Sequence, residues 1–326
     1  MMFGEKPQEL PHRVAFILLP EFTLMPFASA IEPLRLANLQ SEEQLYSWTT
    51  HSVDGADVTC SSGLETRVDS NLDGIPARAD IVVCGGLNIR DYLFQPLINW
   101  LRKTSRQGSN LGAVCTGSHV LAEAGLLQGY KATIHWNNLP GFRETYPDQE
   151  VTGHLFDIDR DRFTCAGGTS SLDLMLALVG SQHGAELASS IAEIILHAPI
   201  RHHSENQRMS LPARIGARHP KLVSIIKQME DNLEDPHSPS ILAKQAGLSA
   251  RQLERLFRRY LDRSPKRYYL ELRLKKARSL LLQTDMSVIN VALACGFTSP
   301  SHFSKCYRAF YGSTPYRERG VPIIET

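Results

Sequence analysis

Cys115 and His135 form the residue pair whose types and positions could do chemistry. Cys115 follows the apolar run 111–114 and precedes Thr116 and Gly117, small residues that allow a strand to turn sharply into a helix. A thiol at such a turn faces the positive helix N-terminus, which favours the thiolate, and backbone N–H groups nearby can stabilise an oxyanion. His135 ends another expected strand, Ala-Thr-Ile-His, and would be the base. The pair predicts either a nucleophile or a ligand pocket.

Residues expected near this pair would shape the same pocket. Gly85 and Gly86 end a neighbouring apolar run and could offer an N–H to an oxyanion, while exposed aromatic faces there would hold a quaternary amine. The alternatives are that the cysteine is a small packing residue, that the histidine bonds a backbone carbonyl, and that the aromatics belong to the core. The expected effector-pocket residues are Cys115, Thr116, His135, Trp136, Gly85, Gly86 and Phe22, with Trp48 as further aromatic surface.

The elements that must position this pocket alternate between short apolar runs and amphipathic stretches. Apolar runs occupy residues 14–19, 80–84 and 111–114, and helical patterns follow at 24–38 and 118–124. This alternation is typical of an α/β fold with a mainly parallel sheet, in which ligands bind beyond the carboxyl ends of the strands. The first half of the chain is therefore expected to be a flavodoxin-like α/β domain with its site at those ends.

The second half reads as helical and carries two helix-turn-helix patterns, in residues 240–260 and 288–310. In the first, Gly247 permits the turn, Ser249 can cap the next helix, and Gln252 completes a capping box. In the second, Gly296 permits the turn, and Ser299 and Pro300 can start the next helix. We expect an all-α domain with two such units.

Basic residues gather around these patterns. Residues 251–278 hold 11 lysines and arginines against 3 acidic residues, which favours phosphate contact over a merely solvated helical bundle. A long helix over 265–283 would space the two second helices for successive major grooves, roughly 34 Å apart. The expected DNA-contacting residues are Arg251, Gln252, Arg255, Arg258, Arg259, Ser301, His302 and Lys305.

The net charge of the 326-residue chain, +1, hides an uneven distribution. The part before His219 has 17 basic and 24 acidic residues, and the rest has 18 basic and 10 acidic residues, as in an acidic sensing or catalytic module joined to a nucleic-acid-binding one. No apolar stretch is long enough for a membrane span or signal peptide, so no membrane association and a cytoplasmic location are expected.

Metal, cofactor and disulfide sites are not expected. The six cysteines lack paired spacing, and His202–His203 has no Cys, Asp or Glu partner at ligand spacing, so we expect these histidines to lie in a solvated linker. Residues 198–219 lose periodicity and gather polar residues and prolines, which is typical of a linker. The expected organisation is 13–197 for sensing, 198–219 as linker and 220–320 for DNA binding.

Residues 13 to about 195 resemble the PfpI-like superfamily through Gly85-Gly86, the cysteine turn, the segment 122–136 and the following histidine. Enzymes of that superfamily place a carboxylate near the position of Pro26, and its proteases have histidine where Thr116 stands. The resemblance therefore implies a catalytically degenerate domain. A Cys115/His135 hydrolase or amidase with an attached DNA-binding module remains the alternative.

Residues 220–320 resemble the AraC/XylS family through 292–297, Ser-His-Phe-Ser at 301–304, Phe-Tyr-Gly at 310–312 and Thr314-Pro315. The order of the two resemblances is that of the GlxA-like transcriptional regulators. It implies an activator that binds double-stranded DNA, recruits RNA polymerase, forms a homodimer, and responds to an amino-acid or quaternary-amine effector such as arginine, glycine betaine or carnitine. A third alternative, an architectural DNA-binding protein without an effector, is less favoured because it would give the α/β domain no function.

Overall fold

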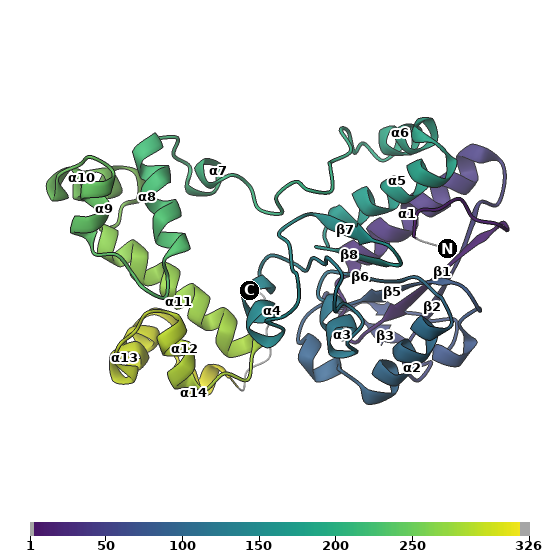
Figure 1. The fold of residues 1–326 in the computed structure, drawn as a ribbon, viewed down its shortest axis with the longest axis horizontal. Helices are drawn as coiled ribbons and strands as arrows, with labels where there is room; N and C mark the ends of the chain where they lie inside the picture. Colours follow the sequence, from purple (N-terminus) through teal and green to yellow (C-terminus); the bar gives the residue numbers. More distant parts are fainter. Residues whose placement is uncertain (1–2, 320–326) are drawn as a thin grey trace. The chain divides into compact units, whose positions relative to one another are not determined.

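A computed structural model describes residues 3–319, and the chain folds into two compact units that meet in sequence between Gln207 and Arg208 (Figure 1). The first is an α/β unit and the second is entirely helical. The end of the expected DNA-binding domain, Gly320, lies outside the described residues. In the described part of the chain, no helix is long and apolar enough to span a membrane.

The α/β unit is built on one six-stranded sheet with the order β2-β1-β5-β6-β8-β7. The first five strands of that order are parallel, and β7 pairs antiparallel with β8. The expectation of a mainly parallel sheet is thereby confirmed. In chain order the strands of this sheet are β1 (His12–Leu18), β2 (Tyr46–His51), β5 (Asp80–Cys84), β6 (Leu111–Val114), β7 (Phe156–Asp159) and β8 (Arg162–Cys165).

Helices cover both faces of this sheet (Figure 1). The strands β1, β5 and β6 carry apolar side chains on both faces, so both faces must be shielded from water. One core includes the inner faces of α1 (Leu24–Ser41), α5 (Ser170–His183) and α6 (Ala185–Ile194). The opposite core includes residues of α2 (Gln95–Arg106), α3 (Ser118–Glu123) and α4 (Leu139–Thr145). The small elements of the unit are β3 (Val58–Thr59), β4 (Glu65–Thr66), η1 (Leu72–Gly74) and η2 (Ile89–Tyr92).

The strand expected to end at His135 does not form. Ala132 makes one isolated parallel bridge to Val151, and Thr133 donates its N–H to the side chain of Thr164 at 2.8 Å instead of to a strand. The edge of β6 away from β5 is already taken by β8, a pairing between segments far apart in sequence. Residues 132–134 are thus a buried loop lying against the sheet, and His135 is half-buried.

The helical unit contains two hydrophobic cores that share one helix. The first core packs α8 (Pro220–Asp231), α9 (Pro239–Gln245) and α10 (Ala250–Leu261) against Tyr269, and the second packs α12 (Val288–Ala294) and α13 (Pro300–Tyr311) against Leu274, Ala277 and Leu280. Tyr269, Leu274, Ala277 and Leu280 all lie on α11 (Pro265–Gln283), the expected spacer. The unit also contains α7 (Leu211–Ile215) and α14 (Pro315–Glu318).

Candidate functional sites

The backbone at Cys115 has the strained geometry of a nucleophile turn. Cys115 adopts a φ of 60°, which is unusual for a residue with a side chain, directly between β6 and the turn into α3. Its N–H donates to the carbonyl of Cys165 at 3.0 Å, and its carbonyl accepts the N–H of His135 at 3.3 Å. The residue is 8% exposed, with Sγ 3.7 Å from Oγ1 of Thr23. The structure thus brings Cys115 and His135 together as neighbours.

The glycines beside this turn serve packing and strand pairing. A Cβ on Gly85 would lie 2.4 Å from the backbone nitrogen of Gly117, so only glycine lets the two backbones approach. Gly85 donates its own N–H to the carbonyl of Val114 at 3.4 Å, and therefore that N–H is already used within the sheet. The buried Thr116 hydroxyl donates to the carbonyl of Gly86 at 2.8 Å. Both contacts hold the turn in place.

The aromatic residues expected at the pocket lie in different surroundings. Trp136 is 41% exposed, and its ring centroid lies 5.5 Å from that of the half-buried His135. Phe22 is fully buried in the core and contacts Phe27 edge-on. Trp48 packs partly buried on the same core. Trp136 is therefore the aromatic face that solvent and a ligand can reach beside His135.

Two buried titratable side chains flank the turn. Burial raises the pKa of the Cys84 thiol, and the nearby Cys115 thiol adds to this effect. Burial lowers the pKa of His119, on α3, to about 3, and the positive charge of Arg90 contributes. Both groups are therefore neutral at physiological pH. The burial of His119 could not be predicted from the sequence, because its packing partners Phe142 and Tyr146 lie on or beside α4, more than 20 residues later in the chain.

The segment that leads to the helical unit is held on the α/β unit by a buried carboxylate. Asp173, on α5, is fully buried; its Oδ2 accepts from Nε and Nη2 of Arg201 at 3.0 and 2.6 Å. Its Oδ1 accepts from the Arg201 backbone N–H at 2.9 Å and pairs with Nε2 of His197 at 2.8 Å. We call these contacts the Asp173 clamp.

The clamp is contiguous with the cysteine turn. Arg201 also donates to Oγ1 of Thr169 at 2.7 Å, in the loop that starts α5. In that loop, a Cβ added to Gly167 would lie 2.9 Å from Cβ of Cys115, so the two backbones touch. The loop that contacts Cys115 therefore also accepts a hydrogen bond from Arg201 of the clamp.

Gln207 makes a second anchor on the other side of the turn. Its Nε2 donates to Oγ1 of Thr133 at 2.9 Å, to the carbonyl of Ile134 at 2.9 Å and to that of His154 at 2.8 Å. Ile134 directly precedes His135. Part of the segment expected to be a solvated linker, up to Gln207, is thus bonded to the α/β unit at both sides of the candidate pocket.

The two second helices of the helical unit begin as expected. Ser249 accepts the N–H of Gln252 at 3.2 Å and Gln252 Oε1 accepts the N–H of Ser249 at 2.8 Å, which completes the capping box of α10. Ser299 accepts the N–H of His302 at 3.3 Å at the start of α13. The caps fix where each helix begins. The side-chain amide oxygen of Gln252, Oε1, is used by the cap of α10.

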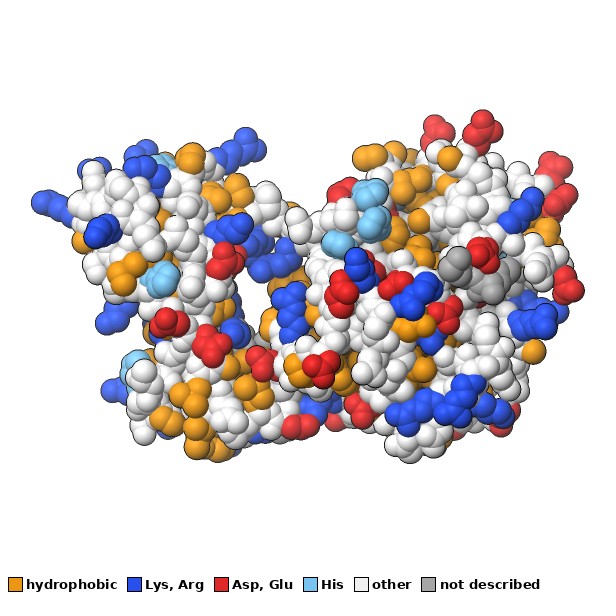
Figure 2. Space-filling model, in the orientation of Figure 1, with side chains coloured by type: hydrophobic (Ala, Val, Ile, Leu, Met, Phe, Trp, Pro, Cys, Tyr) orange, Lys and Arg blue, Asp and Glu red, His pale blue; other side chains and the backbone are white. Residues whose placement is uncertain are grey.

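The side chains expected to contact DNA are all exposed. On α10 these are Arg251, Gln252, Arg255, Arg258 and Arg259, and on α13 they are Ser301, His302 and Lys305. Figure 2 shows basic side chains spread over the helical unit between apolar and polar surface. Both second helices therefore present polar side chains to solvent while Leu253, Phe257, Phe303 and Tyr307 face the cores.

Several basic residues of the 251–278 run have structural partners instead. Arg273 donates to the carbonyls of Cys295 and Gly296, both at 2.7 Å, and its guanidinium lies 4.0 Å from the Phe297 ring centroid. Burial lowers the pKa of Arg273. Lys276 donates to the carbonyl of Ala294 at 2.9 Å. These cations complement the C-terminal end of α12, so the local excess of positive charge overstates the number available to phosphates.

Comparison with known proteins covers both units. Residues 12–181 match the DJ-1/PfpI family, and residues 242–320 match a helix-turn-helix domain family. The chain is 47% identical over 327 residues to the HTH-type transcriptional regulator GbdR of Pseudomonas aeruginosa, covering 98% of this chain and 89% of that protein. It is 36% identical over 305 residues to the HTH-type transcriptional regulator GlxA of Rhizobium meliloti, covering 93% and 94%. A crystal structure of an AraC family regulator from Pseudomonas putida covers 57% of this chain and 100% of its own, with 33% identity and a TM-score of 0.52.

Proposed function

Because this chain belongs to the GlxA-like family of helix-turn-helix transcriptional regulators, we propose that it activates transcription when a small metabolite binds beside Cys115. We propose that it acts as a regulator rather than as an enzyme, because the relatives that align over nearly its whole length are named HTH-type transcriptional regulators. The observation that carries the proposal is the double anchoring of the segment before the helical unit, by Asp173 and by Gln207. A ligand beside Cys115 and His135 would act on both anchors.

The DNA-reading residues we propose are the exposed ones on α10 and α13. Arg255 lies on the solvent face of α10, where a bidentate guanidinium can read a guanine in the major groove. We expect Arg255→Ala to weaken binding to the specific operator by about 1–3 kcal/mol, or about 5- to 150-fold, and to relax specificity at one base pair. Fluorescence anisotropy with operator and single-base variants measures both effects.

The control for Arg255→Ala is Arg106→Ala, which removes the same charge from an exposed position on α2 of the α/β unit. We expect its operator affinity to match that of the wild type. If Arg255→Ala weakens all sequences equally and lowers the slope of log affinity against log salt by about 1, Arg255 contacts a phosphate and not a base. An unchanged affinity would remove Arg255 from the interface.

The effector class we propose is an amino acid or a quaternary amine. The support is Trp136, whose exposed ring stands beside His135, since an aromatic face attracts a cation that cannot donate hydrogen bonds. We expect glycine betaine or carnitine to raise the melting temperature, and Trp136→Ala to weaken that ligand by about 2- to 30-fold. Thermal-shift titration measures both. The control is 3,3-dimethylbutyrate, which has an uncharged tert-butyl group in place of the trimethylammonium group of glycine betaine, and equal binding of it would contradict a cation–π site.

The partners we propose are double-stranded DNA, RNA polymerase and a second copy of the chain. Activation requires contact with the polymerase at the promoter, and a dimer would present four reading helices to the operator. Transcription in a purified system, with and without the effector, tests activation directly. Transcript levels that fall on addition of the effector would replace the activator proposal by a repressor.

A further inference from the structure

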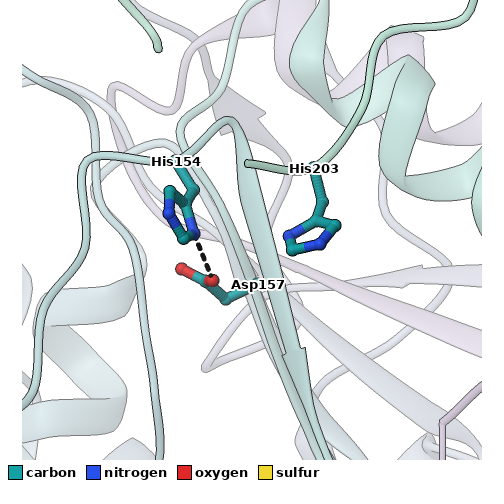
Figure 3. A group of neighbouring side chains, drawn as sticks. All are labelled: His154, Asp157 and His203. Atoms are coloured by element: carbon teal, nitrogen blue, oxygen red, sulfur yellow. Dashed lines mark hydrogen bonds and ion pairs between the residues drawn. The ribbon is translucent and has the colours of Figure 1, made fainter. Parts of the chain in front are cut away.

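His154, Asp157 and His203 converge at one place on the α/β unit. Figure 3 shows the three side chains turned toward one another, with His154 in the loop before β7, Asp157 on β7 and His203 in the segment that leads to the helical unit. Their ligand-type atoms all lie within 4.8 Å of one another. Nδ1 of His154 and Oδ1 of Asp157 are 2.9 Å apart. Two imidazoles and one carboxylate are a recurrent ligand set for divalent transition metals.

We propose that His154, Asp157 and His203 bind one zinc ion or a similar divalent transition metal. Imidazole nitrogen and carboxylate oxygen bind zinc at about 2.0–2.2 Å, so tetrahedral ligands stand about 3.3 Å apart. His203 is exposed, so its ring has room to rotate toward the other two ligands. His154 is half-buried and His203 is exposed, so a water molecule can supply the fourth ligand from the side of His203.

The backbone around these ligands is fixed by hydrogen bonds. The N–H of Leu155 donates to the carbonyl of His203 at 3.0 Å, and His154 makes an antiparallel bridge with Asn206. The carbonyl of His154 accepts from Oγ1 of Thr133 at 2.9 Å and from Gln207. The two segments that carry the histidines are therefore paired, which limits the ordering cost of binding an ion.

The carboxylate has the support that metal-bound carboxylates usually have. Asp157 is buried, and its Oδ2 accepts from Oγ1 of Thr152, which leaves Oδ1 on the side of the histidines. Hydrogen bonds of this kind orient a ligand, and losing one costs about 10- to 100-fold in metal affinity. The spacing of His202–His203 alone predicts no metal site, because the partners come from elsewhere in the chain.

A bound ion would tie the segment before the helical unit to β7. His203 lies between Arg201, which forms the Asp173 clamp, and Gln207, which forms the second anchor. The ion would add a third attachment in the same segment. The proposal does not depend on the effector, because zinc binding is measured on the full chain without any effector or DNA.

The experiment is a zinc titration of the full chain against a chromogenic chelator. It is done in a Cys306→Ser background, because Cys306 Sγ lies 3.4 Å from Nε2 of His302 and offers zinc a second place. We expect one zinc per chain and a melting temperature that rises with zinc. His203→Ala and Asp157→Asn are expected to weaken zinc by at least about 100-fold, since even losing a supporting hydrogen bond costs up to that much.

The matched control is His202→Ala, which removes an adjacent exposed histidine whose Nδ1 lies 2.8 Å from Oγ of Ser204. It should bind zinc as tightly as its parent. Cobalt substitution is expected to give visible bands without a thiolate charge-transfer band. Equal zinc affinity in His203→Ala, no zinc binding in the parent, or a thiolate band from cobalt would each overturn the proposal. Circular dichroism on His203→Ala separates a lost ligand from a lost fold.

Discussion

Replacing Arg201 by alanine is expected to destabilise the α/β unit by about 3 kcal/mol. The change leaves the carboxylate of Asp173, which is 0% exposed, without the cation that pairs with it. Removing one partner of a buried ion pair costs about 3–5 kcal/mol, and the lower figure applies here because His197 and the Arg201 backbone N–H remain. Differential scanning calorimetry should find the α/β transition about 6–12 °C lower.

The control for Arg201→Ala is a double-mutant cycle with Asp173→Asn. An amide in place of the carboxylate removes the buried charge, so in the Arg201→Ala background it should recover part of the lost stability. Arg201→Lys keeps the charge but cannot bond Oδ2 through two nitrogens, and an intermediate loss is expected. Additive effects of the two substitutions would mean that the clamp contributes no coupling energy.

The same variant also tests transmission between the candidate pocket and the DNA. The assay is done at a temperature low enough to keep the Arg201→Ala protein folded, and there we expect it to bind effector and operator. If the clamp transmits the effector signal, this variant should show no effector-dependent change in transcription. The reason is that the clamp joins the loop behind Cys115 to the segment before the helical unit. A normal effector response in this variant would assign transmission to Gln207 or to another route.

The elements that depend on local signals could be predicted from the sequence. The runs 80–84 and 111–114 are β5 and β6 to the residue, and the expected spacer 265–283 is α11, because apolar runs and a Ser-Pro start are local features. The run 132–135 has the same local pattern, but it does not form the expected strand. What excluded it is β8, which occupies the neighbouring edge and lies later in the chain. Pairing partners of that kind are not encoded in the run itself.

The candidate sites also combine local features that the sequence predicts with distant contacts that it does not predict. Small residues around Cys115 predict the strained turn, but they carry no information on Arg201 or Gln207. One signal for the clamp was present: Asp173 is an acidic residue within the otherwise apolar stretch Leu-Asp-Leu-Met-Leu of α5. A carboxylate that must be buried needs a partner. The sequence could indicate that need, whereas only the fold identifies Arg201 and His197 as the groups that meet it.

Gly296→Ala is expected to disrupt the second helix-turn-helix unit. Gly296 has a φ of 72°, and a Cβ there would lie 2.7 Å from the carbonyl oxygens of Leu233 and Glu234. Left-handed backbone costs about 1–2 kcal/mol for a residue with a side chain, and forced overpacking costs about 1–3 kcal/mol more. A shift of the turn would also pull the Gly296 carbonyl away from Arg273. Chemical denaturation is expected to find a loss of about 2–5 kcal/mol in the helical unit.

The equivalent glycine of the first unit supplies the matched control. Gly247 has a φ of 62°, but a Cβ there would meet only the flexible Lys221 Nζ, at 3.8 Å. Gly247→Ala should therefore cost only the backbone strain, about 1–2 kcal/mol. Because α13 depends on the turn at Gly296, Gly296→Ala should lower operator affinity by at least about 100-fold, while the core around α10 keeps its fold. Equal effects of the two substitutions would show that backbone strain, and not the contact with residues 233–234, makes glycine necessary at both turns.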